Sequence, residues 1–375
     1  MTTRLEQLHD AGVSIWCDSI ARDWLEKGEL RRLRDEYSVT GVTSNPSIFQ
    51  KAMGEGSFYD EDLARLARDG DDAHTIFEKL ALTDIRNAAK DMAPVSEQSG
   101  GVDGRVSFEV APDLANDTEA TYDAATRLYR ELSLPNVLIK IPATPEGVPA
   151  IRRAIASGVS VNVTLIFSID RYREVMEAYI SGLEELAEAG GNVGDIASVA
   201  SFFVSRVDSN VDKKLQAIVD KGGPDAEKAR ARLGTTAIDN AKLAYEAFQQ
   251  TFSGERWEAL AAKGARVQRP LWASTSTKNP DYRDVLYVEE LVAENTVNTM
   301  PLETIEAFQD HGEVRGQTIT DGMDRAHALW SDLAALGIDE EQVGKELEDE
   351  GVRKFAESYE DAVATVEEKR KKATS

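Results

Sequence analysis

Apolar runs of strand length recur along this chain, and stretches with helical patterning separate them. The runs are rich in Val, Ile, Phe and Thr and have no clean polar face, which is typical of parallel strands covered by helices. Helical patterning is clear at Ser168–Ala189 and at Pro224–Phe252. Because strands and helices alternate, the pattern predicts a parallel sheet. The eight runs are Val13–Asp18, Gly41–Asn45, Arg105–Val110, Val137–Pro142, Val159–Phe167, Ala197–Ser205, Arg266–Ser274 and Thr296–Pro301.

Polar or ionisable side chains lie at or near the ends of several runs. They are Asp18, Asn45, Glu109, Lys140, Thr164, Arg206 and Ser274. This placement favours a closed (β/α)8 barrel, in which chemistry gathers at the C-terminal ends of the strands. An open doubly wound sheet is the alternative, but no G-x-G-x-x-G or Walker A sequence follows any run. We therefore predict an α/β fold of the (β/α)8 TIM barrel type.

After Pro301 the pattern becomes mostly helical. Met323–Leu336 and Asp339–Glu368 are amphipathic or strongly charged. We expect residues 302–375 to form additional C-terminal helices packed on the barrel, so that residues 1–375 make one barrel domain. The basic tail at Lys369–Lys372 is expected to be a frayed, solvated end.

The chain is strongly acidic, with 43 Lys and Arg against 67 Asp and Glu and a formal net charge of −24. Nucleic acids and anionic membranes bind basic surfaces, so we predict neither as a partner. A small anionic substrate remains compatible with this charge. A few basic groups inside a cleft can outweigh the field of a distant, screened surface.

Cys17 is the only cysteine, so no disulfide can form within the chain and a reducing compartment is the simpler expectation. Met1–Asp10 lacks the basic start and apolar stretch of a secretory signal. No apolar run reaches the roughly 18 residues that a membrane span needs. We therefore expect a cytoplasmic protein.

The histidines do not have the spacing of a metal site, since neither H-x-x-x-H nor a Cys/His pattern occurs. Cys17 precedes Asp18, but strand alternation would point these two side chains to opposite faces. We expect Cys17 to be a small buried apolar side chain and predict no metal. The four histidines are His9, His74, His311 and His327.

Lys140 lies inside an apolar run, Val137–Pro142, where a charged ammonium group would be costly to desolvate. Burial lowers the pKa of a lysine, and an unprotonated amine can attack a ketone to form an imine. A buried Lys–carboxylate pair, or a side chain that reaches solvent past the strand end, explains the same position equally well.

Four motifs in order along the chain resemble those of transaldolases, the class I enzymes that form a Schiff base, and in particular the longer bacterial type. The most specific is LIKIPATPEG at Leu138–Gly147, which resembles the active-site lysine motif. The resemblance covers roughly residues 13 to 301. The other three motifs are TGVTSNPSI at Thr40–Ile48, SVNVTLIF at Ser160–Phe167 and SFFVSRVD at Ser201–Asp208.

The resemblance implies catalytic roles for four residues. Lys140 would form the imine, and Asp18 would exchange the hydroxyl proton as the carbon–carbon bond breaks or forms. Glu109 and Thr164 would hold a water for imine chemistry. The alternatives are an N-cap of a helix near Ser19 for Asp18, an ion pair for Glu109 and ordinary strand packing for Thr164.

The resemblance also implies substrate contacts. Asn45 and Asn162 would hold hydroxyl groups, although either could be a turn residue. Ser201 would contact a carbonyl or hydroxyl, and Phe203 would be a further substrate-binding residue. Arg206 would bind a phosphate, since its planar fork suits a dianion, with a salt bridge to Asp208 as the alternative.

One segment departs from the family pattern. Many transaldolases have a short Ala-Ser-aromatic-Arg-Asn run where this chain has the longer run Ala273–Asn279. Ser274 still aligns with the family serine. Lys278 can supply a phosphate charge, but either Lys278 or Ser276 could take the place of the family arginine.

The implied reaction moves a dihydroxyacetone unit from sedoheptulose 7-phosphate to glyceraldehyde 3-phosphate, giving erythrose 4-phosphate and fructose 6-phosphate in the non-oxidative pentose phosphate pathway. No cofactor is needed, because the lysine imine is the electron sink. The nearest alternative is a fructose 6-phosphate aldolase; such enzymes commonly carry Gln and Tyr where this chain has Glu109 and Phe203. A non-catalytic barrel that binds sugar phosphates is a further alternative. The expected assembly is a monomer or a homodimer.

Overall fold

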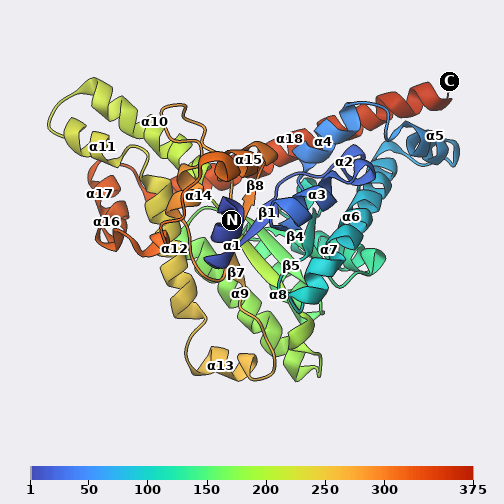
Figure 1. The fold of residues 1–375 in the computed structure, drawn as a ribbon, viewed down its shortest axis with the longest axis horizontal. Helices are drawn as coiled ribbons and strands as arrows, with labels where there is room; N and C mark the ends of the chain where they lie inside the picture. The colour runs from blue at the N-terminus through green and yellow to red at the C-terminus, as the bar shows by residue number, and fades with distance from the viewer. Residues whose placement is uncertain (1, 375) are drawn as a thin grey trace.

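The computed structural model describes residues 2–374, which form a closed barrel of eight parallel strands surrounded by helices (Figure 1). Each strand pairs with the next in the chain, and β8 pairs with β1. The predicted (β/α)8 barrel is confirmed. The strands are β1 Val13–Cys17, β2 Val39–Val42, β3 Arg105–Glu109, β4 Val137–Pro142, β5 Val161–Ile166, β6 Ser198–Phe203, β7 Arg269–Ala273 and β8 Thr296–Met300.

Helices form the outer layer and bury their apolar faces against the strands and one another. Three short 3-10 helices also occur: η1 Pro112–Leu114, η2 Val193–Asp195 and η3 Thr318–Thr320. The α-helices are α1 Arg4–Asp10, α2 Arg22–Lys27, α3 Glu29–Glu36, α4 Pro46–Gly54, α5 Asp60–Arg68, α6 Ala73–Gln98, α7 Thr118–Leu132, α8 Gly147–Ala156, α9 Ile169–Glu188, α10 Ser205–Lys221, α11 Ala226–Arg232, α12 Thr236–Thr251, α13 Glu255–Ala261, α14 Leu286–Glu290, α15 Leu302–His311, α16 Met323–His327, α17 Leu329–Ala335 and α18 Glu340–Thr374.

Several element boundaries differ from the predicted ones. The run predicted at Gly41–Asn45 extends too far, because Asn45 caps α4 and its Oδ1 accepts a hydrogen bond from Ile48 N at 3.1 Å. Pro224–Phe252 forms two helices, α11 and α12, which are separated at Gly234, where φ is +69°. Met323–Leu336 likewise forms two helices, α16 and α17.

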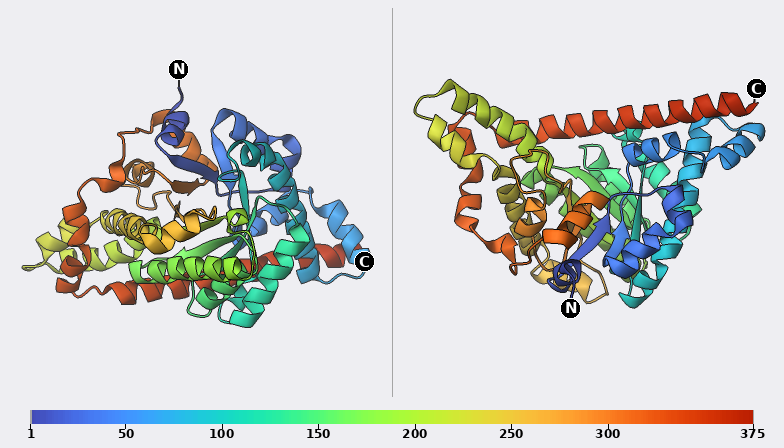
Figure 2. Two further views of the ribbon diagram at one scale, coloured as in Figure 1. Left: turned by 90° about the horizontal axis from the view of Figure 1, so that it is seen from below. Right: turned by 45° about the horizontal axis from the view of Figure 1, so that its top comes forward.

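Helix α18 is a single long helix that runs along one side of the barrel (Figure 2). It packs on α4, α5, α6 and α10 and reaches β5. The expectation of a frayed basic tail is wrong, because α18 continues to Thr374. Near its end, Lys369 Nζ donates a hydrogen bond to Asp60 Oδ1 at 2.9 Å, which ties the tail to α5.

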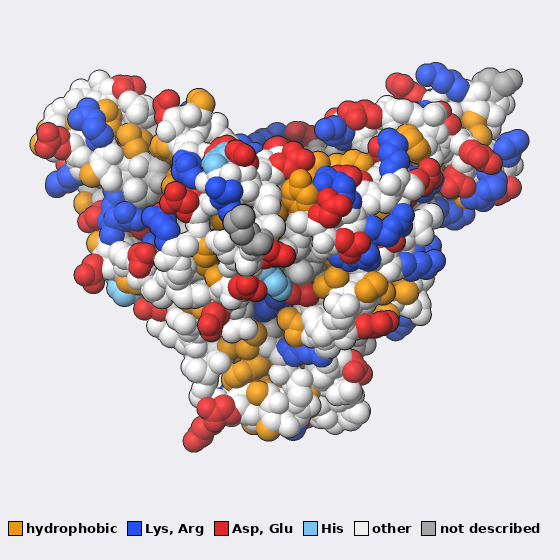
Figure 3. Space-filling model, in the orientation of Figure 1, with side chains coloured by type: hydrophobic (Ala, Val, Ile, Leu, Met, Phe, Trp, Pro, Cys, Tyr) orange, Lys and Arg blue, Asp and Glu red, His pale blue; other side chains and the backbone are white. Residues whose placement is uncertain are grey.

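Acidic and basic side chains are interspersed on the face of the molecule shown in Figure 3, so the excess of acidic residues does not form one continuous patch there. No helix within residues 2–374 is both long enough and apolar enough to cross a membrane.

A buried ionic cluster joins α2, α5 and α6 beside the barrel. Arg22 Nε donates to Asp84 Oδ1 at 2.8 Å, and Tyr59 OH donates to Asp84 Oδ2 at 2.7 Å. Asp84 is fully buried, and burial is the main effect that raises the pKa of its carboxyl against the influence of Arg22. Removing this carboxylate would leave two buried donors without an acceptor.

We expect Asp84→Ala to lower the free energy of unfolding by about 3 kcal/mol, because the buried Arg22 guanidinium keeps only the more exposed Asp62 as a counter-charge and Tyr59 OH loses its acceptor. Asp91→Ala is the matched control on the same helix, since Asp91 pairs with the exposed Arg31 at 3.0 Å. The control variant should lower the free energy of unfolding by less than about 1 kcal/mol. Urea denaturation of both variants measures the difference, and equal losses would contradict a special role for the buried cluster.

Candidate active site

A cavity of about 290 Å³ opens at the C-terminal ends of the strands. Nine of the eleven residues predicted to form the site line it, from β4, β5, β6 and the loops or helix starts that follow β1, β2, β6 and β7. Glu109 and Asn162 are not part of this lining. The cavity lining is Asp18, Thr43, Asn45, Lys140, Thr164, Ser201, Phe203, Arg206, Ala273, Ser274, Ser276, Lys278, Thr299, Pro301, Glu303 and Phe355.

Lys140 lies at the buried end of this cavity, with 5% of its surface exposed. Its Nζ donates a hydrogen bond to the carbonyl oxygen of Ser44 at 2.9 Å and lies 3.3 Å from Glu109 Oε2. Strand register explains the ion pair, because Glu109 on β3 lies directly opposite Lys140 on β4. The lysine therefore has a carboxylate partner and still faces the cavity.

Glu109 and Thr164 flank Lys140 from the two neighbouring strands. Burial raises the pKa of Glu109, and the nearby Lys140 opposes that effect. Thr164 Oγ1 is buried and has no hydrogen-bond partner among residues 2–374, whereas the buried Glu109 Oε2 has Lys140 Nζ as its partner at 3.3 Å. The Thr164 hydroxyl is thus available to a ligand beside the lysine.

Asp18 follows β1 and lines the same cavity. Its Oδ1 accepts a hydrogen bond from Thr43 Oγ1 at 2.6 Å, and Thr43 Oγ1 lies 2.6 Å from Thr299 Oγ1. Asp18 does not cap a helix, since α2 begins at Arg22, so that alternative is wrong. Removal from bulk water raises the pKa of Asp18, while Lys140 is the largest opposing influence.

Cys17, the neighbour of Asp18, is completely buried in β1 and belongs to the apolar cluster on the outer side of that strand. Burial strongly raises the pKa of its thiol. A protonated thiol packed in this way is a small apolar side chain, as the strand alternation predicted.

Asn162 and Ser201 form a buried hydrogen-bonded chain inside the barrel. Asn162 Nδ2 donates to Ser107 Oγ at 3.0 Å, and Ser201 Oγ donates to Asn162 Oδ1 at 2.7 Å. Both polar atoms of the Asn162 amide are therefore engaged within the barrel. Ser201 also lines the cavity, so these hydrogen bonds hold one of the lining side chains in position.

Arg206 lies in the first turn of α10, just after β6. Its guanidinium carbon lies 5.1 Å from the ring centre of Phe203 and 5.8 Å from that of Phe355. Arg206 Nη1 is buried and has no hydrogen-bond partner among the described residues. The suggested salt bridge to Asp208 is not formed, because Asp208 accepts hydrogen bonds from Ala237 N and Tyr287 OH.

The loop after β7 places a second cation on the cavity. Lys278 Nζ donates to Ser276 Oγ at 2.7 Å, and both residues line the cavity. Ser274 has a positive φ of 57°, and its Oγ lies 2.9 Å from Ser205 Oγ. This contact joins the loop to the start of α10 beside Arg206.

Sequence reasoning missed several residues of the lining. Thr43 lies within the TGVTSNPSI motif and could have been found by its spacing from Asn45. Thr299, Pro301 and Glu303 end or follow β8, which the strand-end rule also covers. Phe355 comes from α18, and no local sequence signal places that helix over the cavity.

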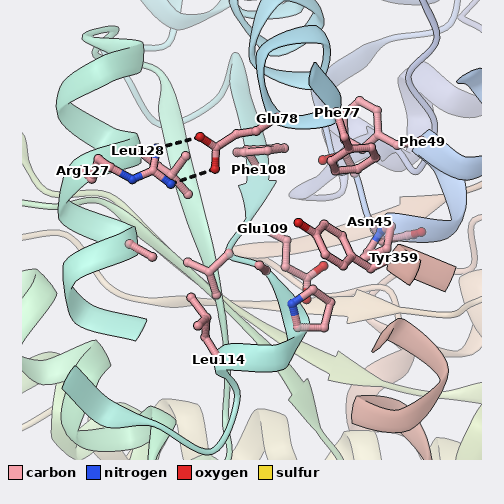
Figure 4. A pocket seen from close by; sticks show the side chains of 16 residues that line it. Asn45, Phe49, Phe77, Glu78, Phe108, Glu109, Leu114, Arg127, Leu128 and Tyr359 are labelled. Carbon is pink, nitrogen blue, oxygen red and sulfur yellow. Dashed lines mark hydrogen bonds and ion pairs between the residues drawn. The ribbon is translucent and has the colours of Figure 1, made fainter. Parts of the chain in front are cut away.

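Two further hollows adjoin the site. A larger groove of about 690 Å³ shares Asp18, Asn45, Pro301 and Glu303 with the cavity and provides room for access. A small one of about 60 Å³ lies on the outer side of β3 next to Glu109. Figure 4 shows aromatic rings around this small hollow and a hydrogen-bonded Glu78–Arg127 pair beside it.

Within residues 2–374, no group of three or more His, Cys, Asp or Glu side chains is arranged to hold a metal ion. The barrel mouth combines the Lys140 amine with three carboxyl groups, of Asp18, Glu109 and Glu303, and two further cations, Arg206 and Lys278. This set can form an imine, move protons and hold an anion.

Comparison with known proteins agrees with this chemistry. Residues 15–366 match the family described as Transaldolase/Fructose-6-phosphate aldolase. A transaldolase of Mycolicibacterium paratuberculosis is 52% identical over 95% of this chain and 94% of its own length. A transaldolase of a Parafrankia species is 50% identical over the whole of both chains. A transaldolase of Frankia alni is 50% identical over 98% of this chain and 97% of its own length. The chain therefore belongs to the transaldolase/fructose-6-phosphate aldolase family.

Proposed function

We propose that this chain is a transaldolase of the non-oxidative pentose phosphate pathway. It transfers a dihydroxyacetone unit from sedoheptulose 7-phosphate to glyceraldehyde 3-phosphate, giving erythrose 4-phosphate and fructose 6-phosphate. The observation that carries the proposal is the buried Lys140, which faces a cavity that also holds Asp18 and two cations. The full-length similarity to proteins named transaldolase supports it.

Imine formation begins at Lys140. Because burial raises the pKa of Glu109, that carboxylate can take a proton from the ammonium group 3.3 Å away and leave a nucleophilic amine. The amine adds to the C2 carbonyl of the ketose, and loss of water gives the imine. The Glu109 carboxylate, together with the Thr164 hydroxyl that has no hydrogen-bond partner among residues 2–374, would hold that water.

Carbon–carbon cleavage is assigned to Asp18. It would take the proton of the C4 hydroxyl as the C3–C4 bond breaks, so that erythrose 4-phosphate leaves and a three-carbon enamine stays on Lys140. The hydrogen bond from Thr43 fixes the carboxylate for this transfer. Asp18 would then return the proton when the enamine adds to the aldehyde carbon of the acceptor, and hydrolysis of the new imine frees fructose 6-phosphate.

Arg206 and Lys278 would bind the substrate phosphate, with Ser274 and Ser276 as neutral donors. The unpartnered Nη1 of Arg206 suits a dianion that accepts two hydrogen bonds. Asn45 and Ser201 would contact substrate hydroxyl or carbonyl groups. Asn162 would act indirectly, by orienting Ser201.

A fructose 6-phosphate aldolase, which releases free dihydroxyacetone, is the second candidate because the family includes both activities. Glu109 and Phe203, where such aldolases commonly carry Gln and Tyr, favour transfer. A barrel that only binds sugar phosphates would not need a buried amine beside Glu109 and Asp18. The ratio of transfer to free dihydroxyacetone distinguishes the first two candidates.

We treat residues 1–375 as one barrel domain, because α18 contributes Phe355 to the cavity lining. The lone, buried Cys17 and the acidic composition support a cytoplasmic location. A monomer or homodimer is the proposed assembly.

Replacement of Lys140 by Ala should abolish turnover and borohydride trapping with fructose 6-phosphate, because no amine remains to form the imine. Lys140→Arg should fail as well, since a guanidinium stays protonated. Peptide mapping of the reduced wild-type adduct should identify Lys140. An adduct on Lys278, or normal activity of Lys140→Ala, would rule out the assignment.

Variants of the two carboxylates should be slowed at different steps of the reaction. Asp18→Asn and Glu109→Gln should each lower kcat by roughly 10²–10⁴-fold, the usual cost of losing a positioned acid or base. Asp18→Asn should accumulate uncleaved donor imine, whereas Glu109→Gln should be slow to form it. In the wild type, cleavage should weaken as pH falls through the raised pKa of Asp18. Cleavage by Asp18→Asn at the wild-type rate in a single turnover would contradict its role.

The phosphate contacts can be tested by comparing kcat/KM for fructose 6-phosphate and fructose. Arg206→Ala should raise KM for the phosphorylated sugar and leave kcat/KM for fructose unchanged. The rise in KM should be larger than in Lys278→Ala, because the Arg206 guanidinium is less exposed than the Lys278 amine and can bind the phosphate through two hydrogen bonds. Some loss of kcat is also expected, since phosphate binding positions the reacting carbons. Equal proportional losses on both sugars would show that neither cation binds the phosphate.

A further inference from the structure

Helix α18 places one aromatic ring on the cavity, close to both Lys140 and Arg206. Phe355 is only 6% exposed and is the one residue of α18 in the described cavity lining. The centre of its ring lies 5.9 Å from Lys140 Nζ and 5.8 Å from the guanidinium carbon of Arg206. Both distances are within the range of cation–π contacts.

Close packing fixes the position of this ring. Gly351 lies one turn before Phe355, and a Cβ added there would lie 2.9 Å from Leu165 Cδ2 and 3.7 Å from Arg206 Nη1. The helix backbone therefore rests almost directly on the end of β5, where Leu165 has a positive φ of 60°. One turn after Phe355 on the same helix, Ser358 is held to α4 by a hydrogen bond from Ser47 of 2.7 Å. The ring has little freedom to leave the cavity.

The proposed reaction leaves a three-carbon enamine on Lys140, and this intermediate has two possible fates. In transfer, its nucleophilic carbon bonds to the aldehyde carbon of the acceptor. In release, the same carbon takes a proton, water adds to the imine carbon, and the C–N bond breaks to give dihydroxyacetone and the free amine. Both fates end in hydrolysis of an imine, so they differ in whether water and a proton reach the three-carbon intermediate first.

We propose that Phe355 is a specificity-determining residue that keeps water from the enamine on Lys140 and so favours transfer over release. The inference rests on the proposed function. An apolar ring beside Lys140 can neither donate a proton nor hold a water, and it fills space that solvent would otherwise occupy. The ring centres of Phe355 and Phe203 lie 5.8 Å and 5.1 Å from the Arg206 guanidinium carbon, so Phe355 also helps to position the cation that would bind the phosphate while the aldoses exchange.

The experiment supplies fructose 6-phosphate as donor and erythrose 4-phosphate as acceptor, and measures free dihydroxyacetone and sedoheptulose 7-phosphate in the same reaction. In Phe355→Ala the ratio of release to transfer should rise roughly tenfold, and in Phe355→Leu by less because leucine still fills part of the space. Borohydride should still trap the intermediate on Lys140 in both variants. Phe355→Leu keeps the test valid if the alanine variant does not fold.

Leu347→Ala is the matched control. Leu347 is 2% exposed on the same helix and does not line the cavity, so its loss loosens α18 without removing the ring. The control should keep the wild-type ratio. An unchanged ratio in folded Phe355 variants, or an equal rise in Leu347→Ala, would overturn the inference. Failure of the wild type to form any trapped adduct would instead overturn the proposed function itself.

Discussion

The burial of Lys140 beside Glu109 is the constraint on which the rest of the site depends. Taking an amine and a carboxylate out of water is costly unless each keeps a close partner. Here the partners are the Ser44 carbonyl at 2.9 Å and the Glu109 carboxylate at 3.3 Å. The register of β3 and β4 places Glu109 opposite Lys140, and the segment between β2 and α4 supplies the Ser44 carbonyl. The same burial raises the pKa of Glu109, against the opposing influence of Lys140.

Further polar groups surround this pair. Asn162 on β5 lies opposite Lys140, and its amide forms hydrogen bonds with two serines, so its polar atoms are not left unpaired inside the barrel. At the cavity, Thr43 donates a hydrogen bond to Asp18. Arg206 and Lys278 lie on the same cavity, so a chain with a net charge of −24 still presents cations to an anionic substrate. Local geometry therefore outweighs the overall charge.

Helix α18 connects the end of the chain to this chemistry. It packs on α4, α5, α6 and α10, and the close approach at Gly351 brings it against β5. The helix therefore contributes to stability along its length and to the cavity at Phe355. Its basic end is also tied down, through Lys369 and Asp60.

The sequence by itself determined the barrel and most of its site. Strand-length apolar runs with polar ends predicted the eight strands, and nine of eleven predicted site residues line one cavity because parallel strands in a barrel end on the same side. Only the tertiary structure decided that the Asn162 amide is engaged by two serines, that Asp18 accepts a hydrogen bond from Thr43 and caps no helix, and that Phe355 lines the cavity. These outcomes depend on register between strands and on the path of a helix far away in sequence, and local residue patterns do not encode either one.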